Sequence, residues 1–370
     1  MRLLIAGGGT GGHLFPGVAI AQELLRRSPE HRVLFVGTGK ELEVKVLERE
    51  GLPHRAVMAG GLAGKSIGEK VLSLLKLPIC LFQSLAILRS FRPNLVLGTG
   101  GYVSGPVCLA AWLMRIPLVL QEQNVMPGLT NRLLGPLARG VLLASEKALG
   151  SFPPGRAHVV GNPLRAGFSH EVKRRTDYEG TPFRLLIFGG SQGARSINRA
   201  IMEALPYLER VKEGLSILHQ TGERDLEAMR AAYAKAGFSA EVVPFIEDMD
   251  YELARAHLAL CRSGAMTVAE LTSLGVPSLL IPLPSAAHGH QEANARFLEE
   301  KSAAQVLPER DLTGEVLAKR ILSLMEDRKR LKGMSESALS LGRPDASRLC
   351  ADLCLRLAGE RPERPVERAS

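Results

Sequence analysis

The sequence has few aromatic residues and few cysteines, and it has no long hydrophobic run. Only 5% of its 370 residues are aromatic, so stacking platforms for single-stranded nucleic acid are not expected. Its five cysteines form no CxxC pair, which indicates reduced, mostly buried thiols and a reducing compartment. No apolar stretch approaches the ~20 residues of a transmembrane helix, and the first strand lacks the pattern of a signal peptide. We expect a protein that is soluble or peripheral to a membrane.

The charge is basic but not clustered. A net charge of +9 favours an anionic partner, which could be nucleic acid, acidic lipid or a phosphorylated substrate. The scattered lysines and arginines, together with the scarcity of aromatic residues, argue against nucleic acid. The length of 370 residues predicts two domains.

Strands and helices alternate along the chain in a pattern that predicts doubly wound parallel sheets. Leu3–Ala6 is a continuous apolar run, typical of a central parallel strand, and a helix is expected from about Pro16 to Arg27. The pattern restarts at Phe183–Phe188, and a helix is expected from about Arg195. The other expected strands are Val33–Val36, Leu95–Leu97, Pro117–Gln121, Gly140–Ala144, Ser216–Gln220, Ala240–Phe245, Ala259–Cys261 and Pro277–Pro282.

This restart divides the chain into two expected domains, 1–162 and 163–342. Gly161–Pro163 is the expected hinge, and the helix within 343–358 is expected to cross back to the first domain. Residues 359–370 are rich in proline and charge, so we expect them to be disordered.

Three glycine-rich loops, at 7–12, 98–105 and 189–193, follow expected strands. Glycines let a backbone approach a phosphate, and a helix N-terminus adds N–H donors and a positive dipole. Ligands of open α/β sheets lie at the carboxyl ends of strands, so two facing domains would line one central cleft with these loops. An NAD site is disfavoured, because the second strand ends in Val36-Gly37-Thr38 without an acidic residue for the ribose.

Seven motifs occur in order along residues 1 to about 358. They are GGGTGGHLFPG (7–17), GTGGYVSGP (98–106), QEQNVMPG (121–128), GNPLR (161–165), GGSQGARSIN (189–198), CRSGAMTVAEL (261–271) and HQEANA (290–295). Together they resemble the motifs of the MurG family of bacterial peptidoglycan glycosyltransferases. The resemblance implies the GT-B fold, an α/β architecture of two Rossmann-like doubly wound parallel-sheet domains facing a central cleft.

The resemblance also implies an activity and a donor site. N-acetylglucosamine would pass, with inversion, from UDP-N-acetylglucosamine to the 4-hydroxyl of the N-acetylmuramoyl group of undecaprenyl-linked lipid I, giving lipid II. Ser191 would meet the UDP diphosphate, Glu270 the ribose hydroxyls and Gln291 the sugar. The other implied donor-binding residues are Thr10, Gly11, Gly12, Asn124, Arg165, Ile246, Ala265, Met266, Thr267, Val268 and Ala269.

The first two loops are expected to hold the acceptor diphosphate. The acceptor-binding residues would be Gly9, His13, Gly100, Gly101 and Tyr102. His13 begins the first helix, and a neutral imidazole suits removal of a proton from a sugar hydroxyl. Glu122 is the alternative base, and an imidazole that only shapes the loop is the alternative interpretation of His13.

No metal ion or other cofactor is expected. The stretch 248–250 has the DxD form of a metal motif, but an aspartate before a helix is an ordinary N-cap. Arg165 and Arg262 could offset charge on departing UDP, and Arg262 could equally be a structural bridge. Gln121 and His288 stand where the family commonly has histidine and aspartate, which leaves the sugar contacts open.

Residues 60–92 mix apolar side chains with lysines and arginines. They could enter a bilayer surface while the cations meet anionic headgroups, or they could be helices packed on the first sheet. Because the implied acceptor is membrane-linked, we expect a peripheral protein on the cytoplasmic face of the inner membrane. Its expected partners are UDP-N-acetylglucosamine, lipid I, the anionic membrane surface and the cell-wall and division machinery.

Two other functions stay open at this point. A UDP-N-acetylglucosamine epimerase of the same fold would consume the donor without an acceptor. A non-catalytic membrane scaffold with degenerate sites would not bind UDP.

Overall fold

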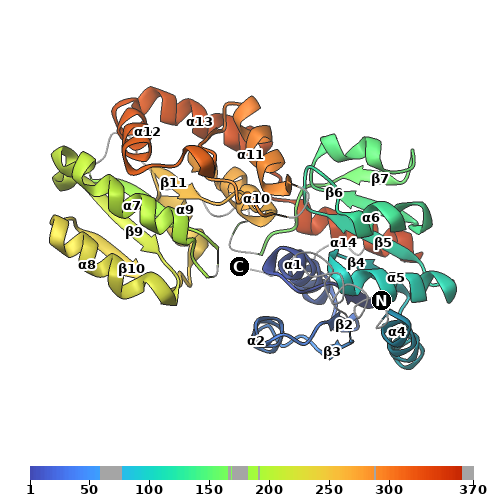
Figure 1. The fold of residues 1–370 in the computed structure, drawn as a ribbon. Coiled ribbons are helices and arrows are strands. Elements are labelled where there is room, and N and C mark those ends of the chain that lie inside the picture. The colour runs from blue at the N-terminus through green and yellow to red at the C-terminus, as the bar shows by residue number, and fades with distance from the viewer. Residues whose placement is uncertain (59–76, 166–167, 169–181, 191, 287–288, 361–370) are drawn as a thin grey trace. The chain divides into compact units, whose positions relative to one another are not determined.

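The computed structural model describes residues 1–58, 77–165, 168, 182–190, 192–286 and 289–360 (Figure 1). The chain forms two compact units, Met1–Ala166 with Arg343–Ser370, and Gly167–Gly342. The first unit extends to Ala166 instead of the expected 162, because the Ser347 hydroxyl donates to the buried Leu164 at its carbonyl oxygen, over 2.7 Å. The expected surface loop at 173–180 and residues 361–370 lie outside the described residues.

The first unit contains a seven-stranded sheet in the order β3-β2-β1-β4-β5-β6-β7. All of its neighbouring strands are parallel. Its strands are β1 (Arg2–Ala6), β2 (Arg32–Gly37), β3 (His54–Ala56), β4 (Leu95–Gly98), β5 (Leu118–Glu122), β6 (Gly140–Leu143) and β7 (Ala157–Val159). Its helices are α1 (Gly11–Arg27), α2 (Glu41–Arg49), α4 (Leu77–Phe91), α5 (Gly101–Leu113), α6 (Leu129–Leu134) and α14 (Ala346–Ala358).

The second unit contains a six-stranded parallel sheet in the order β10-β9-β8-β11-β12-β13. Its strands are β8 (Phe183–Phe188), β9 (Leu215–Gln220), β10 (Ala240–Val243), β11 (Leu258–Cys261), β12 (Ser278–Leu280) and β13 (Ala304–Val306). Its helices are α7 (Arg195–Leu208), α8 (Leu226–Ala236), α9 (Met249–Arg255), α10 (Ala265–Leu274), α11 (His290–Glu300), α12 (Gly314–Glu326) and α13 (Arg328–Leu341). Short 3-10 turns lie at Gly135–Leu137, Glu146–Ser151, Glu209–Gly214, Glu223–Asp225 and Glu309–Asp311.

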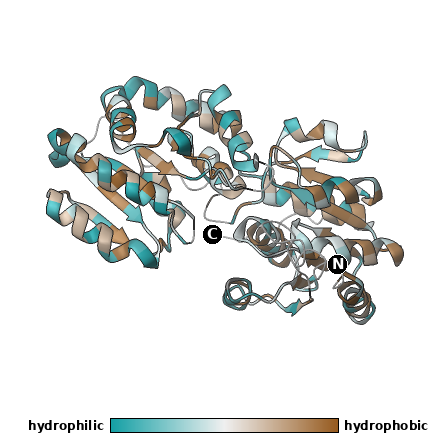
Figure 2. Ribbon diagram, viewed as in Figure 1, coloured by the Kyte–Doolittle hydropathy of each residue, from teal (hydrophilic) through white to brown (hydrophobic). Residues whose placement is uncertain are grey.

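Helices cover both faces of the first sheet. Leu3 and Ile5 of β1 share a buried cluster with residues of α1 and α14, whereas Leu4 shares a cluster with residues of α4 and α5. Alternate side chains of a strand point to opposite faces, so a strand that is apolar throughout needs cover on both sides. In Figure 2 the central strands of both sheets are accordingly brown. The fold class expected from the sequence is confirmed for each unit, and their expected arrangement across a cleft stays a prediction.

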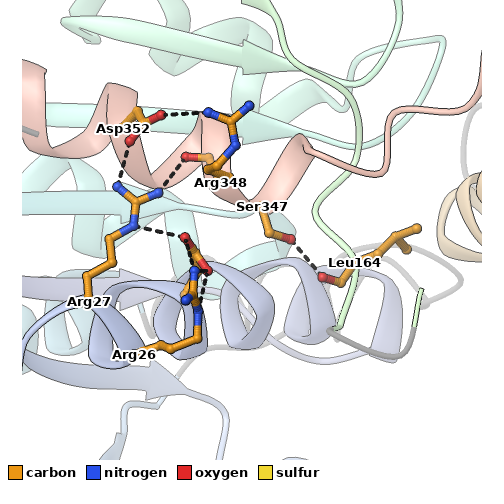
Figure 3. Close-up of polar contacts among 7 residues, drawn as sticks. Arg26, Arg27, Leu164, Ser347, Arg348 and Asp352 are labelled. Atoms are coloured by element: carbon orange, nitrogen blue, oxygen red, sulfur yellow. Dashed lines mark hydrogen bonds and ion pairs between the residues drawn. The ribbon is translucent and has the colours of Figure 1, made fainter. Parts of the chain in front are cut away.

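A buried arginine joins α14 to α1 (Figure 3). Arg27 Nε donates to Glu23 at 2.9 Å, its Nη1 to Asp352 at 2.5 Å and its Nη2 to the carbonyl of Arg348 at 3.1 Å. Cys350 and Cys354 of α14 belong to a buried core cluster of the first unit, together with residues of α1. The C-terminal helix is therefore an integral part of the first unit.

The helix α1 starts earlier than the sequence indicated, at Gly11 instead of near Pro16. Thr10 is extended and precedes the helix, and Pro16 lies inside it. A proline cannot donate to the carbonyl four residues earlier, which here is Gly12. Gln123 Nε2 donates to that Gly12 oxygen at 2.9 Å instead, so the interior proline leaves no unpaired carbonyl at this turn.

Candidate active site

The first unit places two of the expected glycine loops next to each other. β1 and β4 are neighbours with Ala6 paired to Gly98, and the strand order reverses between them. The loop at 7–10 leads into α1 and the loop at 99–100 leads into α5. Both helix N-termini therefore start at the carboxyl end of the sheet, where open α/β sheets bind ligands and where amides and dipoles favour an anion.

Close approach requires glycine at these loops. A Cβ on Gly7 would lie 1.8 Å from Thr99 Oγ1, and a Cβ on Gly101 would lie 2.8 Å from the carbonyl oxygen of Gly8. Gly101 also has φ of 80°, a conformation that side chains other than glycine rarely adopt. The two loops consequently form one packed surface.

His13 lies in the first turn of α1, where it contacts both loops. Its Nδ1 is 3.0 Å from Thr10 Oγ1, and its carbonyl oxygen accepts from the Thr99 hydroxyl at 2.7 Å. A Cβ on Gly100 would lie 2.7 Å from Cδ2 of the imidazole, so the ring rests on the second loop. The other expected acceptor residues, Gly9, Gly101 and Tyr102, belong to the same loops and helix starts, and Tyr102 is exposed.

Gln123 was missed by the sequence reasoning, although it ties the two loops together. Its Nε2 lies 2.9 Å from the carbonyl oxygens of both Gly12 and Thr99, and its side chain is buried. The signal that could have found it is Pro16, which leaves the Gly12 carbonyl in need of another donor.

Glu122 is buried at the end of β5 and accepts four hydrogen bonds from its own chain. Its Oε1 accepts from the backbone and side-chain amides of Asn124 at 3.0 and 3.1 Å. Its Oε2 accepts from the Gly128 backbone and from Asn131 Nδ2, each at 2.9 Å. A carboxylate has about four acceptor positions, so these bonds use its capacity and fix the segment 124–131. Next to it, Gln121 Nε2 donates to Asn162 Oδ1 at 3.2 Å, in the expected hinge.

Glu43, in the first turn of α2, is a second buried carboxylate that the sequence reasoning missed. It accepts from the backbone amides of Gly9, Thr38 and Gly39 and from the Thr38 hydroxyl. The second strand has no acid at its end, as expected, yet this side chain reaches the same place from the following helix.

The second unit repeats the arrangement at its own reversal of strand order. β8 and β11 are neighbours, the loop at 189–193 follows β8, and α10 begins after β11. A Cβ on Gly193 would lie 1.8 Å from the carbonyl oxygen of Thr221, so this loop packs directly on the end of β9. Ser191, the expected diphosphate contact, lies outside the described residues, as does His288.

Gln220 supports both the third loop and Ile246, one of the expected donor-binding residues. Its Nε2 donates to the Gly190 carbonyl at 2.6 Å, and its Oε1 accepts from the Ile246 backbone at 3.1 Å. Next to it on β9, His219 is buried between the Tyr233 hydroxyl and Asn198 Oδ1, at 3.0 and 3.1 Å. Burial lowers the pKa of His219 to about 3, so the ring is neutral in the folded protein.

The expected ribose and sugar residues lie around the start of α10. Residues 265–270, with Glu270 half-buried, form its first turns, and helix N-termini of this kind attract phosphate. Gln291 Oε1 accepts from the backbone amides of Ser263 and Leu283 at 3.3 and 3.0 Å. The acceptor atom of Gln291 therefore holds the loops, and its amide nitrogen is the atom suited to a sugar oxygen.

The two arginines considered for charge compensation have different surroundings. Arg262 is buried, and its guanidinium lies 2.5 Å from Glu309, 2.8 Å from Ser196 Oγ and 3.1 Å from the Ile281 carbonyl. These contacts make Arg262 a structural bridge. Arg165 lies in the first unit, with its guanidinium 5.4 Å from the centre of the Phe15 ring on α1.

The DxD stretch begins α9. Asp248 stands at the N-cap position as expected, but its side chain makes no capping hydrogen bond, and Asp250 lies in the first turn. Its support for the helix is therefore limited to charge at the dipole. No group of three metal-ligating side chains is close enough to hold an ion in the described part of the chain.

Comparison with known proteins places this geometry in a family context. Residues 3–143 match the N-terminal domain of glycosyltransferase family 28, and residues 184–349 match its C-terminal domain. The chain is 44% identical, over the full length of both proteins, to the UDP-N-acetylglucosamine–N-acetylmuramyl-(pentapeptide) pyrophosphoryl-undecaprenol N-acetylglucosamine transferase of Anaeromyxobacter dehalogenans.

Solved structures agree with this match. The crystal structure of Acinetobacter baumannii MurG superposes with a TM-score of 0.77 and 32% identity, covering 96% of this chain and 99% of that one. A UDP-N-acetylglucosamine 2-epimerase from Neisseria meningitidis has a TM-score of 0.67 at 15% identity over 96% of this chain and all of that one, a likeness of fold alone.

Proposed function

Since the chain belongs to the MurG family within glycosyltransferase family 28, we propose that it transfers N-acetylglucosamine from UDP-N-acetylglucosamine to lipid I. The product is lipid II, the disaccharide-bearing precursor of peptidoglycan. The single observation that carries the proposal is that each unit presents glycine loops and helix N-termini at its own reversal of strand order. The first unit takes the acceptor diphosphate and the second takes UDP.

In the proposed reaction the acceptor 4-hydroxyl attacks the anomeric carbon of the donor. The new carbon–oxygen bond forms as the bond to the UDP oxygen breaks, so UDP leaves with the electron pair and the configuration inverts. His13 takes the hydroxyl proton on Nε2, in the tautomer whose Nδ1–H donates to Thr10 Oγ1. Glu122 is assigned to positioning, because its oxygens already accept four hydrogen bonds within the protein.

Departing UDP carries charge that the second unit is suited to stabilise. The first turns of α10 and the loop at 189–193 direct amides and a helix dipole toward one end of β8 and β11. Glu270 accepts from the ribose hydroxyls, and Gln291 donates its amide to the sugar. Ile246, whose backbone is held by Gln220, borders the base.

The test is UDP release measured with several UDP-sugars, with and without a lipid I analogue. We expect release only with UDP-N-acetylglucosamine and the analogue together, and loss of release in His13→Ala. Consumption of the donor without the analogue would indicate an epimerase or hydrolase instead. Failure to bind UDP in calorimetry would indicate a scaffold.

We further propose that the first unit binds the cytoplasmic face of the cell membrane. Large apolar side chains are exposed on three helices that pack in series, α4, α5 and α6. The most exposed on each helix are Phe82 at 71%, Leu113 at 53% and Leu133 at 69%. Arg89, Arg115 and Arg132 are exposed on or beside these helices. Apolar side chains can enter the headgroup region while arginines meet anionic lipids.

This surface differs from the expected one. Residues 59–76 lie outside the described residues, so only the α4 part of the expected stretch 60–92 contributes, and α5 and α6 add to it. None of the helices in the described ranges is long and apolar enough to cross a bilayer.

Sedimentation with anionic vesicles tests the surface. Phe82→Asp should reduce binding to the vesicles, whereas Tyr207→Asp, at an exposed residue of the second unit, should not. Equal binding by both variants would contradict it.

A further inference from the structure

The strongest unexplained feature of the first unit is the carboxylate of Glu43. Its side chain is only 3% exposed, although an isolated buried carboxylate is costly. The Thr38 amide and hydroxyl each donate to it at 2.8 Å, and the Gly39 amide donates at 3.1 Å. The Gly9 amide also donates to it. These donors belong to the ends of two neighbouring strands, so Glu43 joins the first glycine loop to the segment after β2.

The neighbouring glycines are shaped around this carboxylate. A Cβ on Gly8 would lie 2.5 Å from Glu43 Oε1, and a Cβ on Gly37 would lie 2.6 Å from Oε2. Gly8 has φ of 143°, a backbone conformation that suits glycine. Part of the glycine content of this loop therefore serves to enclose the protein's own anion.

The third loop, in the second unit, is held without such an anion in its described part. Gln220 donates to the Gly190 carbonyl, and Gly193 packs against the Thr221 carbonyl. In the unit proposed to bind UDP, the glycine loop is thus held by a neutral side-chain amide. In the first unit a carboxylate accepts from the Gly9 amide instead, so this amide is engaged within the protein.

We propose that Glu43 is a positioning residue of the transferase: it acts as a built-in anion that holds the first loop in its binding shape and leaves only the amides toward α1 for the acceptor. This inference rests on the proposed function. The carboxylate holds Gly9, which is followed by Thr10, the N-cap of α1. It thereby fixes the position of the first turn of α1 and of His13, whose ring contacts Thr10. The Gly9 amide, expected to bind the acceptor, is assigned to this internal contact.

Chemical rescue tests the anion directly. Glu43→Ala should lower kcat with the lipid I analogue on the order of 10²-fold, the effect of a misplaced reacting group. The UDP dissociation constant, set by the second unit, should stay within about twofold. Formate should fill the vacated site and restore much of kcat, whereas formamide and sodium chloride of equal ionic strength should not. The matched control is Glu41→Ala, on the same turn of α2 but exposed and paired with Lys45.

A second measurement is independent of turnover. Hydrogen exchange of peptides covering 7–13 should accelerate in Glu43→Ala and slow again with formate. Kinetics of Glu43→Ala like those of the unaltered protein, or equal rescue by formamide, would overturn the proposal. If the unaltered protein released no UDP with the analogue, the transferase assignment would fail, and the exchange data would still decide whether Glu43 holds the loop.

Discussion

At the scale of single residues, the position of His13 depends on the absence of other side chains. Its ring lies against Gly100, where a Cβ would come within 2.7 Å of Cδ2, and Gly100 has φ of 96°. The Thr99 hydroxyl holds the His13 carbonyl from the same loop. A base must reach a hydroxyl within hydrogen-bond distance, so a small displacement of this ring has a large effect on rate.

Gly100→Ala should therefore lower kcat on the order of 10²-fold by moving the imidazole. Binding of UDP should be unchanged, because Ser191, Glu270 and Ile246, assigned to the diphosphate, the ribose and the base of UDP, lie on the second unit. The control is Gly105→Ala in the same motif, where a Cβ meets nothing closer than 3.8 Å and the backbone is helical. Steady-state kinetics with both variants measures this, and equal kcat values would contradict the assignment of His13.

His219 makes the stability of the second unit depend on pH. Its folded pKa of about 3 lies below the ordinary histidine value of 6.5, so the unfolded chain binds the extra proton. The stabilisation is present above pH 6.5 and is lost as the pH falls toward 3, with a slope of up to about 1.4 kcal/mol per pH unit. Hydrogen exchange of β9 between pH 7 and 5 measures the slope, and His219→Gln should flatten it. An unchanged slope in that variant would remove His219 as the cause.

Sequence reasoning found the short ordered motifs, but it missed the roles of residues that act across long separations, including Gln123 within one of those motifs. Glu43 reaches Gly9, Gln123 reaches Gly12 and Gln220 reaches Gly190, over separations of 34, 111 and 30 residues. Glutamate and glutamine on a helix or after a strand are ordinary surface residues by composition. Only the folded positions of their donors and acceptors distinguish them.

At the scale of elements, strands buried on both faces were easy to predict, whereas of the four edge strands of the two sheets only β10 was predicted. β11 is apolar throughout, and β1 and β8 are apolar apart from Arg2 and Arg184, because helices cover these strands on both sides. β3 and β7, at the two edges of the first sheet, are three residues each and carry polar side chains such as His54 and His158. Such short segments have no periodicity that a sequence could display.

The contact between α1 and α14 predicts a difference between two adjacent arginines (Figure 3). The Arg27 side chain is 1% exposed and joins Glu23 to Asp352, whereas that of Arg26 is 51% exposed and contacts Glu23 alone. Arg27→Met should lower the free energy of unfolding of the first unit by about 2 kcal/mol. This is less than the cost of breaking a fully buried ion pair, because Asp352 is partly exposed. Arg26→Met should cost less than about 0.5 kcal/mol.

The two variants are distinguished by the rate of hydrogen exchange in the α14 peptide, measured at increasing urea concentration. Because the chain has two units, exchange in α14 is a better measure than a single unfolding midpoint. Equal protection of α14 in Arg26→Met and Arg27→Met would show that the apolar contacts of Cys350 and Leu355 alone hold this helix.

At the scale of the whole molecule, the two units share an architecture but differ in the side chain that holds their glycine loop. Each reverses its strand order beside a glycine loop, yet the first loop already encloses the Glu43 carboxylate. In the second unit the described part of the loop is held by the neutral amide of Gln220, which donates to the Gly190 carbonyl. The two loops therefore differ in what supports them, a carboxylate in the first unit and a neutral amide in the second, and the proposed function assigns the acceptor diphosphate to the first unit and UDP to the second.

The most direct test of this division is the footprint of UDP on the full chain, measured by hydrogen exchange with and without saturating UDP. The account predicts protection of peptides covering 189–194, 244–247 and 262–272, with the exchange of peptides covering 7–13 and 98–104 unchanged. Protection of the 7–13 peptide with no change at 262–272 would contradict it.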